Sequence, residues 1–253
     1  MGEIPPHADV VAKRRDVLTA LSTPTTKPQL VERVDYSRST VDRAIDDLLD
    51  HGFVERRGSE YVATYAGREA VAAYEGFLDR LDAVEAAQPV LGALPPSVDI
   101  EPAALHGAEV IESTKAAPVA PLEAATTLGT GATELYAAGL SVLPHYIEEV
   151  GELVEDDDET ELVLTESAFD VFSSTYEAVC RAFLDADNVT VYIIEESLPY
   201  ALWIAEKREE TVSGIIVHTD DGISGVINND TAAMNEWVRE EYERRRRDAD
   251  PLD

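Results

Sequence analysis

The segment from Thr26 to Thr64 restricts the possible folds of this chain more than any other stretch of the sequence. Leu30, Val31 and Val34 share one face of a short helix. Ser37 stands where it can cap the first turn of a second helix. The apolar positions of that second helix recur at helical spacing: Val41, Ala44, Ile45, Leu48 and Leu49. The pattern predicts two short helices joined by a tight turn.

A hairpin is predicted directly after these helices. Gly52 can supply the left-handed conformation that commonly ends a helix. Residues 53–55 and 60–64 have the composition of short strands, and Arg56-Arg57-Gly58-Ser59 is the predicted turn between them. Another helix is expected earlier, at residues 9–21. Three helices followed by a hairpin predict an α+β winged helix-turn-helix, a fold that places one helix in the DNA major groove.

The distribution of charge supports contact between this N-terminal region and a polyanion. The chain has a formal net charge of −31, from 20 Lys and Arg against 51 Asp and Glu. Residues 1–68 hold ten of the basic and eleven of the acidic residues, a balance of −1. The rest of the chain carries the other ten and forty, a balance of −30. Basic residues are therefore kept where DNA binding is predicted and are scarce elsewhere.

Polar and basic side chains are expected on the outer face of the helix that begins after Ser37. The N-terminal part of a recognition helix reaches base edges, and arginine is suited to paired hydrogen bonds with guanine. The predicted DNA contacts are Ser37, Arg38, Ser39, Thr40, Arg43, Arg56 and Arg57. An alternative is that the winged helix binds another protein rather than DNA. Double-stranded DNA is the partner that the basic hairpin favours.

A long helix is predicted at residues 65–94, with a nearly continuous apolar stripe. Such a stripe can form a dimer seam or pack on the following domain, and a homodimer is the preferred interpretation. Pro95, Pro96 and Pro102 mark a linker. The predicted organisation is a winged helix-turn-helix at 1–68, a connecting and dimerisation helix with linker at 69–101, and an effector-sensing or assembly domain at 102–253.

Strands and helices alternate in the C-terminal region. Strands are predicted at 109–113, 134–142, 161–165, 189–195, 201–206, 214–219 and 222–227. Helices are predicted at 123–128, 144–154, 167–186 and 231–247. This order predicts a C-terminal α/β domain with a mixed sheet flanked by helices.

A small-molecule effector would bind near the ends of the predicted strands. Polar and aromatic residues occupy such positions: Tyr136, His145, Thr165, Glu166, Ser167, Tyr200 and Trp203. For Tyr200 and Trp203, a place in the hydrophobic core is an equally good interpretation.

Signatures of catalysis and of metal or cofactor binding are weak. The glycines of Leu128-Gly129-Thr130-Gly131 lack the Lys-Ser/Thr of a phosphate-binding loop. The single cysteine, Cys180, excludes an internal disulfide, and the five histidines lack the spacing of a zinc site. No run approaches the roughly 18 apolar residues of a membrane span. We therefore expect a cytoplasmic protein without catalytic residues, metal, cofactor or membrane contact.

Residues 8–70 resemble archaeal winged-helix transcriptional regulators of the MarR/ArsR-like and TrmB-like kind. The longer pattern looks like haloarchaeal regulators with a methanogenesis-regulator (FilR-type) middle domain, on the motifs Leu198-Pro199-Tyr200-Ala201-Leu202-Trp203 and Asn235-Glu236-Trp237-Val238-Arg239. The extreme acidity also resembles the proteins of salt-loving archaea, whose molar salt shortens the Debye length to roughly 3 Å.

The resemblance implies a ligand-responsive transcriptional regulator that binds double-stranded DNA as a homodimer. It also implies that the C-terminal domain is similar to the phospholipase D fold, whose catalytic signature is His-x-Lys with a downstream Asp. Neither His145 nor His218 is followed by lysine two residues later. The C-terminal domain is therefore expected to be phospholipase-D-like but non-catalytic.

Overall fold

The computed structural model describes residues 5–139, 159–219 and 222–252. Contacts divide the chain into two compact units, Met1–Leu81 and Asp82–Asp253. The division falls within the segment 69–101, which the sequence predicts as a connection. Each unit encloses a hydrophobic core of its own.

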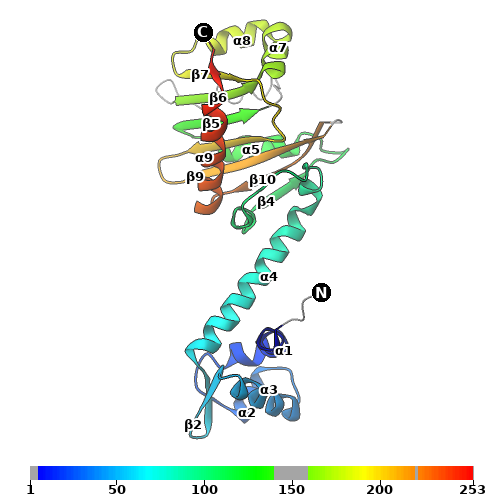
Figure 1. Cartoon of the computed structure of the whole chain (residues 1–253), viewed down its shortest axis with the longest axis vertical. Helices are drawn as coiled ribbons and strands as arrows, with labels where there is room; N and C mark the ends of the chain where they lie inside the picture. The colour runs from blue at the N-terminus through cyan, green and yellow to red at the C-terminus, as the bar shows by residue number, and fades with distance from the viewer. Residues whose placement is uncertain (1–4, 140–158, 220–221, 253) are drawn as a thin grey trace. The chain divides into compact units, whose positions relative to one another are not determined.

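The first unit consists of helices and a small antiparallel sheet (Figure 1). Its elements in chain order are α1 (Pro6–Ala20), β1 (Thr25–Thr26), α2 (Lys27–Arg33), α3 (Arg38–Asp50), β2 (Val54–Arg57) and β3 (Glu60–Ala63). The strands lie in the order β1-β3-β2. The largest fully buried side chains of its core are Leu18, Leu21, Leu30, Ile45 and Leu48. The order of helices and hairpin agrees with that predicted for a winged helix-turn-helix.

Local hydrogen bonds explain where the short helices begin and end. The side chain of Gln29 accepts a hydrogen bond from the backbone N–H of Thr26, which places Thr26 at the start of α2. Ser37 Oγ accepts from the backbone N–H of Thr40 and caps α3, as predicted. Gly52 follows α3 with a φ of 71°, the left-handed conformation that only glycine adopts at little cost.

The hairpin differs from the prediction in two respects. Arg57 pairs with Glu60, so the turn consists of Gly58 and Ser59 alone, and the predicted four-residue turn is wrong. Arg56 and Arg57 therefore lie in β2. In addition, β1, which pairs with β3, is a strand that the sequence does not predict, because two residues are too few to give a period-two pattern.

Helix α4 (Tyr65–Leu91) begins directly after β3 and contributes to both cores. Val71 packs against the core of the first unit, whereas Ala87 and Val90 belong to the core of the second. The helix ends three residues before the predicted end, and Pro89 lies in its last turn. Proline is compatible with a helix end but not with a long continuation.

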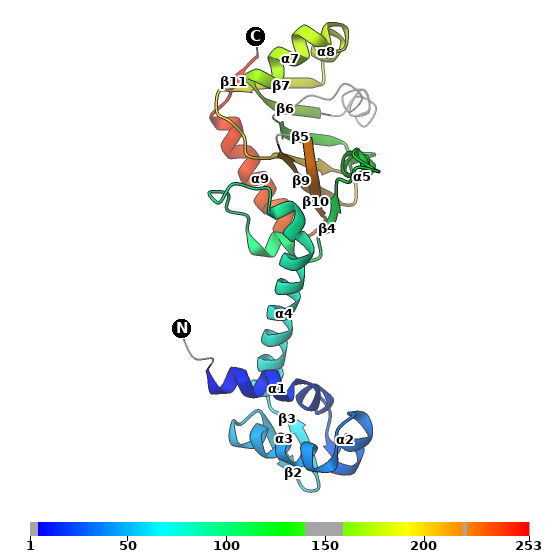
Figure 2. The ribbon, with the colours of Figure 1, turned by 90° about the vertical axis from the view of Figure 1, so that its right-hand side faces the viewer.

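The second unit is a mixed sheet covered by helices on both faces (Figure 2). The first elements of this unit after α4 are η1 (Pro102–Leu105), β4 (Glu109–Glu112) and α5 (Ala120–Gly129). The central part contains β5 (Glu134–Gly139), β6 (Glu159–Thr165), α7 (Glu166–Thr175), α8 (Glu177–Leu184) and β7 (Val189–Ile194). The chain continues with β8 (Ala201–Glu206), β9 (Thr211–Thr219), β10 (Gly222–Asn229), α9 (Ala232–Arg247) and β11 (Asp250–Pro251).

The strand order is β11-β7-β6-β5-β8-β9-β10-β4. Strands β5, β6 and β7 are parallel, and the other neighbours are antiparallel. Helix α9 and the end of α4 pack on one face, around residues such as Leu202 and Ile204 of β8. Helices α5, α7 and α8 cover the opposite face. The predicted mixed sheet flanked by helices is confirmed.

The prediction of a single helix at 167–186 is wrong, because the chain forms two helices there. Tyr176, with φ −123° and ψ 39°, separates α7 from α8. The hydroxyls of Ser173 and Ser174 donate to the carbonyl oxygen of Asp170, and such side-chain hydrogen bonds compete with helical ones. The predicted helix at 144–154 and the end of the predicted strand 134–142 lie outside the described residues.

Replacing Gly67 by alanine should destabilise the first unit. An added Cβ would lie 2.0 Å from the carbonyl oxygen of Phe53. Overpacking of this kind typically costs about 1–3 kcal/mol. Gly76→Ala is a matched control in the same helix, because nothing lies within 4 Å of its Cβ position. That substitution should stabilise the helix by about 0.5–1 kcal/mol. Urea unfolding followed by circular dichroism measures both, and equal changes in unfolding free energy would contradict the packing described.

Candidate nucleic-acid interface and ligand pocket

The N-terminal end of α3 presents an exposed polar edge. Ser37, Arg38 and Ser39 are exposed, and Thr40 is half-buried. Ser37 Oγ lies 2.8 Å from the hydroxyl of Thr40 and 3.0 Å from that of Ser39, so the cap orders three hydroxyls at one helix end. Arg43 is exposed one turn later, and its Nε donates to the carbonyl oxygen of Ser39 at 3.2 Å. The structure thus brings together all the DNA contacts predicted on this helix.

The acidic residues of α3 are partly neutralised by the other helices. Lys27 of α2 forms an ion pair with Asp42 at 2.7 Å. Arg14 of α1 forms one with Asp47 at 2.9 Å. The hydrogen bond between Lys27 and Asp42 raises the pKa of the lysine and lowers the pKa of the carboxyl group. Arg38, by contrast, forms no ion pair within the described part of the chain, and its charge remains available.

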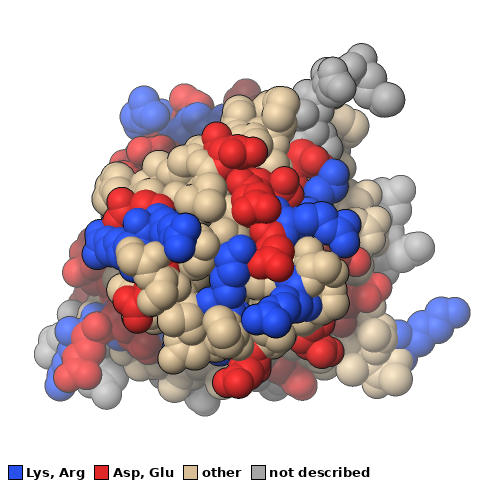
Figure 3. Space-filling model, turned by 90° about the horizontal axis from the view of Figure 1, so that it is seen from below, with Lys and Arg blue, Asp and Glu red and all other residues tan. Residues whose placement is uncertain are grey.

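The two hairpin arginines differ in availability. Arg57 forms an ion pair with Glu55 of the same strand, at 2.6 Å. Arg56 donates to the carbonyl oxygen of Gly58 and lies over the ring of Tyr61, with its charge otherwise uncompensated among the described residues. Basic side chains lie among acidic ones on the face seen in Figure 3, so the surface is not uniformly basic. Arg56 is therefore the better placed of the two to contact an anion.

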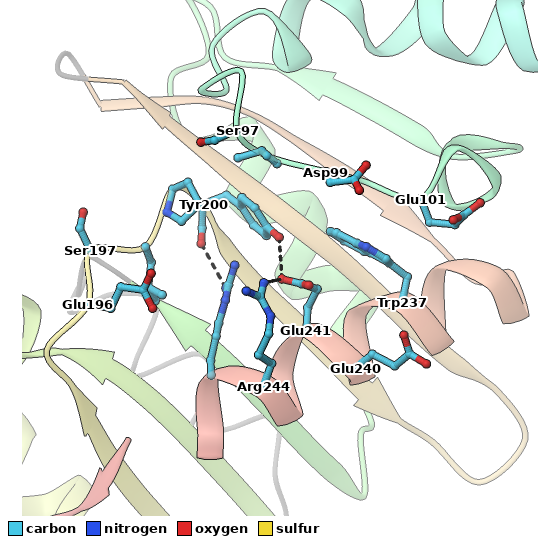
Figure 4. A pocket seen from close by; sticks show the side chains of 14 residues that line it. Ser97, Asp99, Glu101, Glu196, Ser197, Tyr200, Trp237, Glu240, Glu241 and Arg244 are labelled. Carbon is cyan, nitrogen blue, oxygen red and sulfur yellow. Dashed lines mark hydrogen bonds and ion pairs between the residues drawn. The ribbon is translucent and has the colours of Figure 1, made fainter. Parts of the chain in front are cut away.

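The second unit contains a cavity of about 520 Å³ next to Tyr200. Its walls come from the segment 97–101, the loop 196–200 and one face of α9 (Figure 4). The hydroxyl of Tyr200 donates to Glu241 Oε2 at 3.1 Å, and its ring stacks with that of Trp237, with centroids 6.1 Å apart. Burial raises the pKa of Tyr200 to about 12, so its hydroxyl stays protonated at neutral pH and can donate a hydrogen bond.

A buried arginine forms part of the same wall. Arg245 is 5% exposed and donates from Nη1 to the carbonyl oxygen of Tyr200 at 3.3 Å. Its guanidinium also lies 4.5 Å from the centroid of the Tyr200 ring. No carboxylate of a described residue forms an ion pair with it. Burial accordingly lowers the pKa of Arg245. The neighbouring Arg244 instead pairs with Glu241.

The predicted effector residues are distributed over several places. Tyr200 lines the cavity, whereas Trp203 is buried on the opposite face of the sheet. Tyr136 packs edge-on against Tyr242 and donates to Glu134. Thr165 caps α7, so Thr165, Glu166 and Ser167 lie where β6 ends. His145 lies outside the described residues. The structure does not gather these residues into one site.

Sequence reasoning missed most of the pocket wall. The sequence marks Trp237 only as part of a family-like motif, and Arg245 stands in a run of four arginines that gives no sign of which one is buried. Nothing in the sequence singles out the segment 97–101 except its position after the paired prolines Pro95 and Pro96. The part of the chain that the structure describes contains no group of His, Cys, Asp and Glu able to hold a metal ion. It also contains no helix long and apolar enough to cross a membrane.

Comparisons with known proteins identify related families. The family model described as the middle domain of the methanogenesis regulatory protein FilR1 matches residues 118–248, just over half of the 253 residues. A second model, the HVO_A0261 N-terminal domain, matches residues 9–86. Comparison with curated protein sequences gave no match.

Solved structures give only distant likenesses. The chain is similar to TrmBL2, described as an archaeal chromatin protein with a novel mode of DNA binding, with a TM-score of 0.42, 10% identity, and coverage of 99% of this chain and 100% of that one. For HmgR of Pseudomonas aeruginosa the TM-score is 0.26 and the identity 15%, with coverage of 94% of this chain and 95% of that one. For an O-methyltransferase family protein from Burkholderia thailandensis the TM-score is 0.25 and the identity 9%, with coverage of 76% of this chain and 60% of that one. These likenesses do not separate a regulator from an enzyme.

Removing the hydroxyl that caps α3 should destabilise the polar edge. Ser37→Ala leaves the backbone N–H of Thr40 without its acceptor and should cost about 1 kcal/mol of unfolding free energy. Ser37→Thr retains the hydroxyl and is the matched control. Thermal unfolding of the whole chain measures both variants. An alanine variant as stable as the threonine variant would show that the cap contributes nothing.

Proposed function

The chain belongs to the family of the FilR1 middle domain, and we propose that it is a sequence-specific DNA-binding transcriptional regulator. The observation that carries the proposal is the exposed edge of α3, where Arg38 and Arg43 keep their charge while Asp42 and Asp47 are paired with cations of α1 and α2. This arrangement orients positive charge outward from a helix that would otherwise repel phosphate. No catalytic role is part of the proposal.

In this function α3 lies in the major groove. Arg38 and Arg43 reach base edges, and Ser37, Ser39 and Thr40 contact phosphates or bases near the helix start. Arg56 and Arg57 of the hairpin contact the backbone or the minor groove. The acidic composition resembles that of proteins that work in molar salt. In such salt the release of counterions contributes little, so base contacts and dimer geometry determine affinity more than phosphate contacts do.

A protein-binding role for the same surface is the alternative. Asp46 and Asp50 remain exposed on α3, and Arg57 is already paired with Glu55. Exposed carboxylates oppose DNA but are compatible with a protein partner. A binding experiment with DNA therefore decides between the two.

We propose that the chain acts as a homodimer through α4. Tyr74, Phe77, Leu81 and Val84 are separated by three, four and three residues, which is the spacing of a two-stranded coiled-coil seam. Phe77, Leu81 and Val84 are 53%, 49% and 43% exposed. Large apolar side chains repeated along one helical stripe support pairing with a second copy. Such pairing would space two copies of α3 for a symmetric DNA site.

We further propose that a small molecule in the Tyr200 cavity regulates DNA binding. The cavity wall includes segment 97–101, which follows α4 after only a few residues. A ligand there would contact the chain directly after the dimer helix and so influence the spacing of the two α3 helices. The remaining predicted effector residues, and the likeness of this domain to the phospholipase D fold, stay predictions.

Arg43→Ala should weaken DNA binding without affecting assembly. A duplex selected from random sequences by binding in concentrated potassium chloride serves as the probe. Loss of a base contact should reduce affinity about tenfold or more, whereas loss of a phosphate contact lowers the slope of affinity against salt by about one. Fluorescence anisotropy measures both quantities.

Arg208→Ala is the matched control, because this exposed arginine lies between β8 and β9 of the other unit. Its affinity for the selected duplex should equal that of the unaltered chain. Two outcomes would contradict DNA binding by α3 and favour the protein-binding alternative. Either the selection enriches no sequence, or Arg43→Ala binds the duplex as tightly as the control does.

Leu81→Glu should dissociate the homodimer. The substitution places a carboxylate in the centre of the apolar stripe, where pairing would bury it against its symmetry mate. Light scattering should change from the mass of two chains to that of one. Ala72→Glu, which lies on α4 away from the stripe and is exposed, is the control and should remain dimeric. A single-chain mass for the unaltered protein would refute the seam.

A further inference from the structure

The wall of the cavity next to Tyr200 carries charges of both signs. Two arginines line it, Arg244 and Arg245. Five carboxylates line it as well: Asp99, Glu101, Glu196, Glu240 and Glu241. Of these five, Glu241 accepts from the hydroxyl of Tyr200 and pairs with Arg244. The other four carboxylates form no hydrogen bond or ion pair with a described residue.

Arg245 adds a cation whose hydrogen-bonding capacity is largely unused. It is 5% exposed, and of its guanidinium nitrogens only Nη1 donates to a described residue, at the carbonyl oxygen of Tyr200. Nε and Nη2 have no partner there, yet neither is among the fully enclosed unpaired polar atoms of the described chain. These two nitrogens donate from one edge of the guanidinium, the fork that holds both oxygens of a carboxylate. A buried arginine with a free fork in a cavity wall points to an anionic group on the ligand.

The charges of the wall disfavour a ligand that is only an acid or only a base. A simple carboxylate would pair with Arg245 but would face four unpaired carboxylates, which repel it. A simple amine would pair with those carboxylates and leave the buried guanidinium without a counterion, which is costly. A ligand that carries a carboxylate and an ammonium group close together satisfies both kinds of charge.

The rest of the wall offers apolar surface. The stacked rings of Tyr200 and Trp237 lie beside the charged side chains of α9 (Figure 4). Val98 and Leu198 also line the cavity. Its volume of about 520 Å³ lies within the range of sites that hold small organic molecules. The cavity can therefore take an apolar side chain together with two charged groups.

We propose that this cavity binds an α-amino acid in its zwitterionic form. The carboxylate of the ligand accepts from Nε and Nη2 of Arg245, and its ammonium group donates to the unpaired carboxylates of the wall. The side chain of the ligand packs against Trp237 and Leu198. This inference names the chemical class of the effector, so it rests on the proposed role of the Tyr200 cavity. It does not require DNA binding or dimer formation.

Matched ligands test the proposal on the whole, unaltered chain. L-Leucine and L-phenylalanine are the probes. 4-Methylpentanoate and 3-phenylpropanoate are their analogues without the ammonium group, and 3-methylbutylamine and 2-phenylethylamine are their analogues without the carboxylate. Titration calorimetry in concentrated potassium chloride measures the affinities. At least one amino acid should bind about tenfold or more tightly than both of its analogues, because each analogue loses one charge-assisted contact.

NMR locates the bound ligand. The chain contains two tryptophans, and of these only Trp237 lines the cavity. In the chain labelled with ¹⁵N, Trp237→Phe assigns the two indole N–H signals. The amino acid that binds should shift the Trp237 signal in a saturable manner. Trp203 belongs to the core on the opposite face of the sheet, and its signal is the internal control.

Two variants test the two charged contacts separately. Arg245→Met removes the buried charge while keeping an apolar stem, and it should weaken the amino acid about tenfold or more but leave the amine analogue unaffected. The wall variant replaces the four unpaired carboxylates by amides: Asp99→Asn, Glu101→Gln, Glu196→Gln and Glu240→Gln. It should weaken the amino acid to a similar extent. Its control removes the same charge at exposed positions outside the wall: Asp187→Asn, Glu195→Gln, Glu209→Gln and Glu236→Gln. The control should bind as the unaltered chain does.

The proposal is overturned if neither amino acid binds, if an analogue binds as tightly as its parent, or if the Trp237 signal does not respond. It is also overturned if the wall variant, or a folded Arg245→Met, binds the amino acid as tightly as the unaltered chain. Should Arg245→Met fail to fold, the analogues and the wall variant still decide. DNA binding is measured separately with the selected duplex. A chain that binds the duplex but no amino acid refutes this inference alone, whereas a chain that binds an amino acid but no DNA refutes the regulator and leaves this inference standing.

Discussion

Burial of apolar side chains has to offset the mutual repulsion of 51 acidic residues, because the chain has only 20 basic ones. In the second unit this burial centres on β8, whose residues from Ala201 to Ala205 are all buried. Helix α9 covers one face of the strand and α5 covers the other. Ion pairs add local links, such as those of Arg239 with Glu206 and of Arg246 with Glu161. The apolar layers on the two faces of the sheet are therefore the constraint on which the second unit depends.

The scarcity of cations makes their positions informative. In the first unit, Lys27 and Arg14 are used to neutralise acidic residues of α3. Arg38 and Arg43 on the same helix remain exposed. In the second unit, Arg245 is buried without a carboxylate partner among the described residues, although acidic residues outnumber basic ones around it. A fold governed only by charge neutralisation would not place its basic residues in this way. The arrangement supports a function for the exposed arginines of α3 and for the wall of the Tyr200 cavity.

The alternation of side chains along a strand separates the two faces of the sheet in the second unit. Tyr200, just before β8, joins the core beneath α9, while Trp203 belongs to the core on the α5 face. The cavity next to Tyr200 is lined in part by segment 97–101, which follows α4 after a few residues. On the opposite face, Gly214 of β9 lies between Trp203 of β8 and Asn228 of β10 in the register of the sheet. One sheet thus offers two chemically different environments at a short separation along a single strand.

The sequence by itself determined the order of the main helices and strands, although it missed β1, β11 and the division between α7 and α8. Ser37, Thr26 and Gly52 act through hydrogen bonds and backbone conformation within a few residues, so their effects can be predicted from local sequence. Apolar periodicity likewise predicted α3, α4 and α9. Only the tertiary structure decided that Arg245 is buried while Arg244 pairs with Glu241. It also decided that Gly214 lies between Trp203 and Asn228, because strand register depends on contacts between segments distant in the chain, which no local pattern encodes.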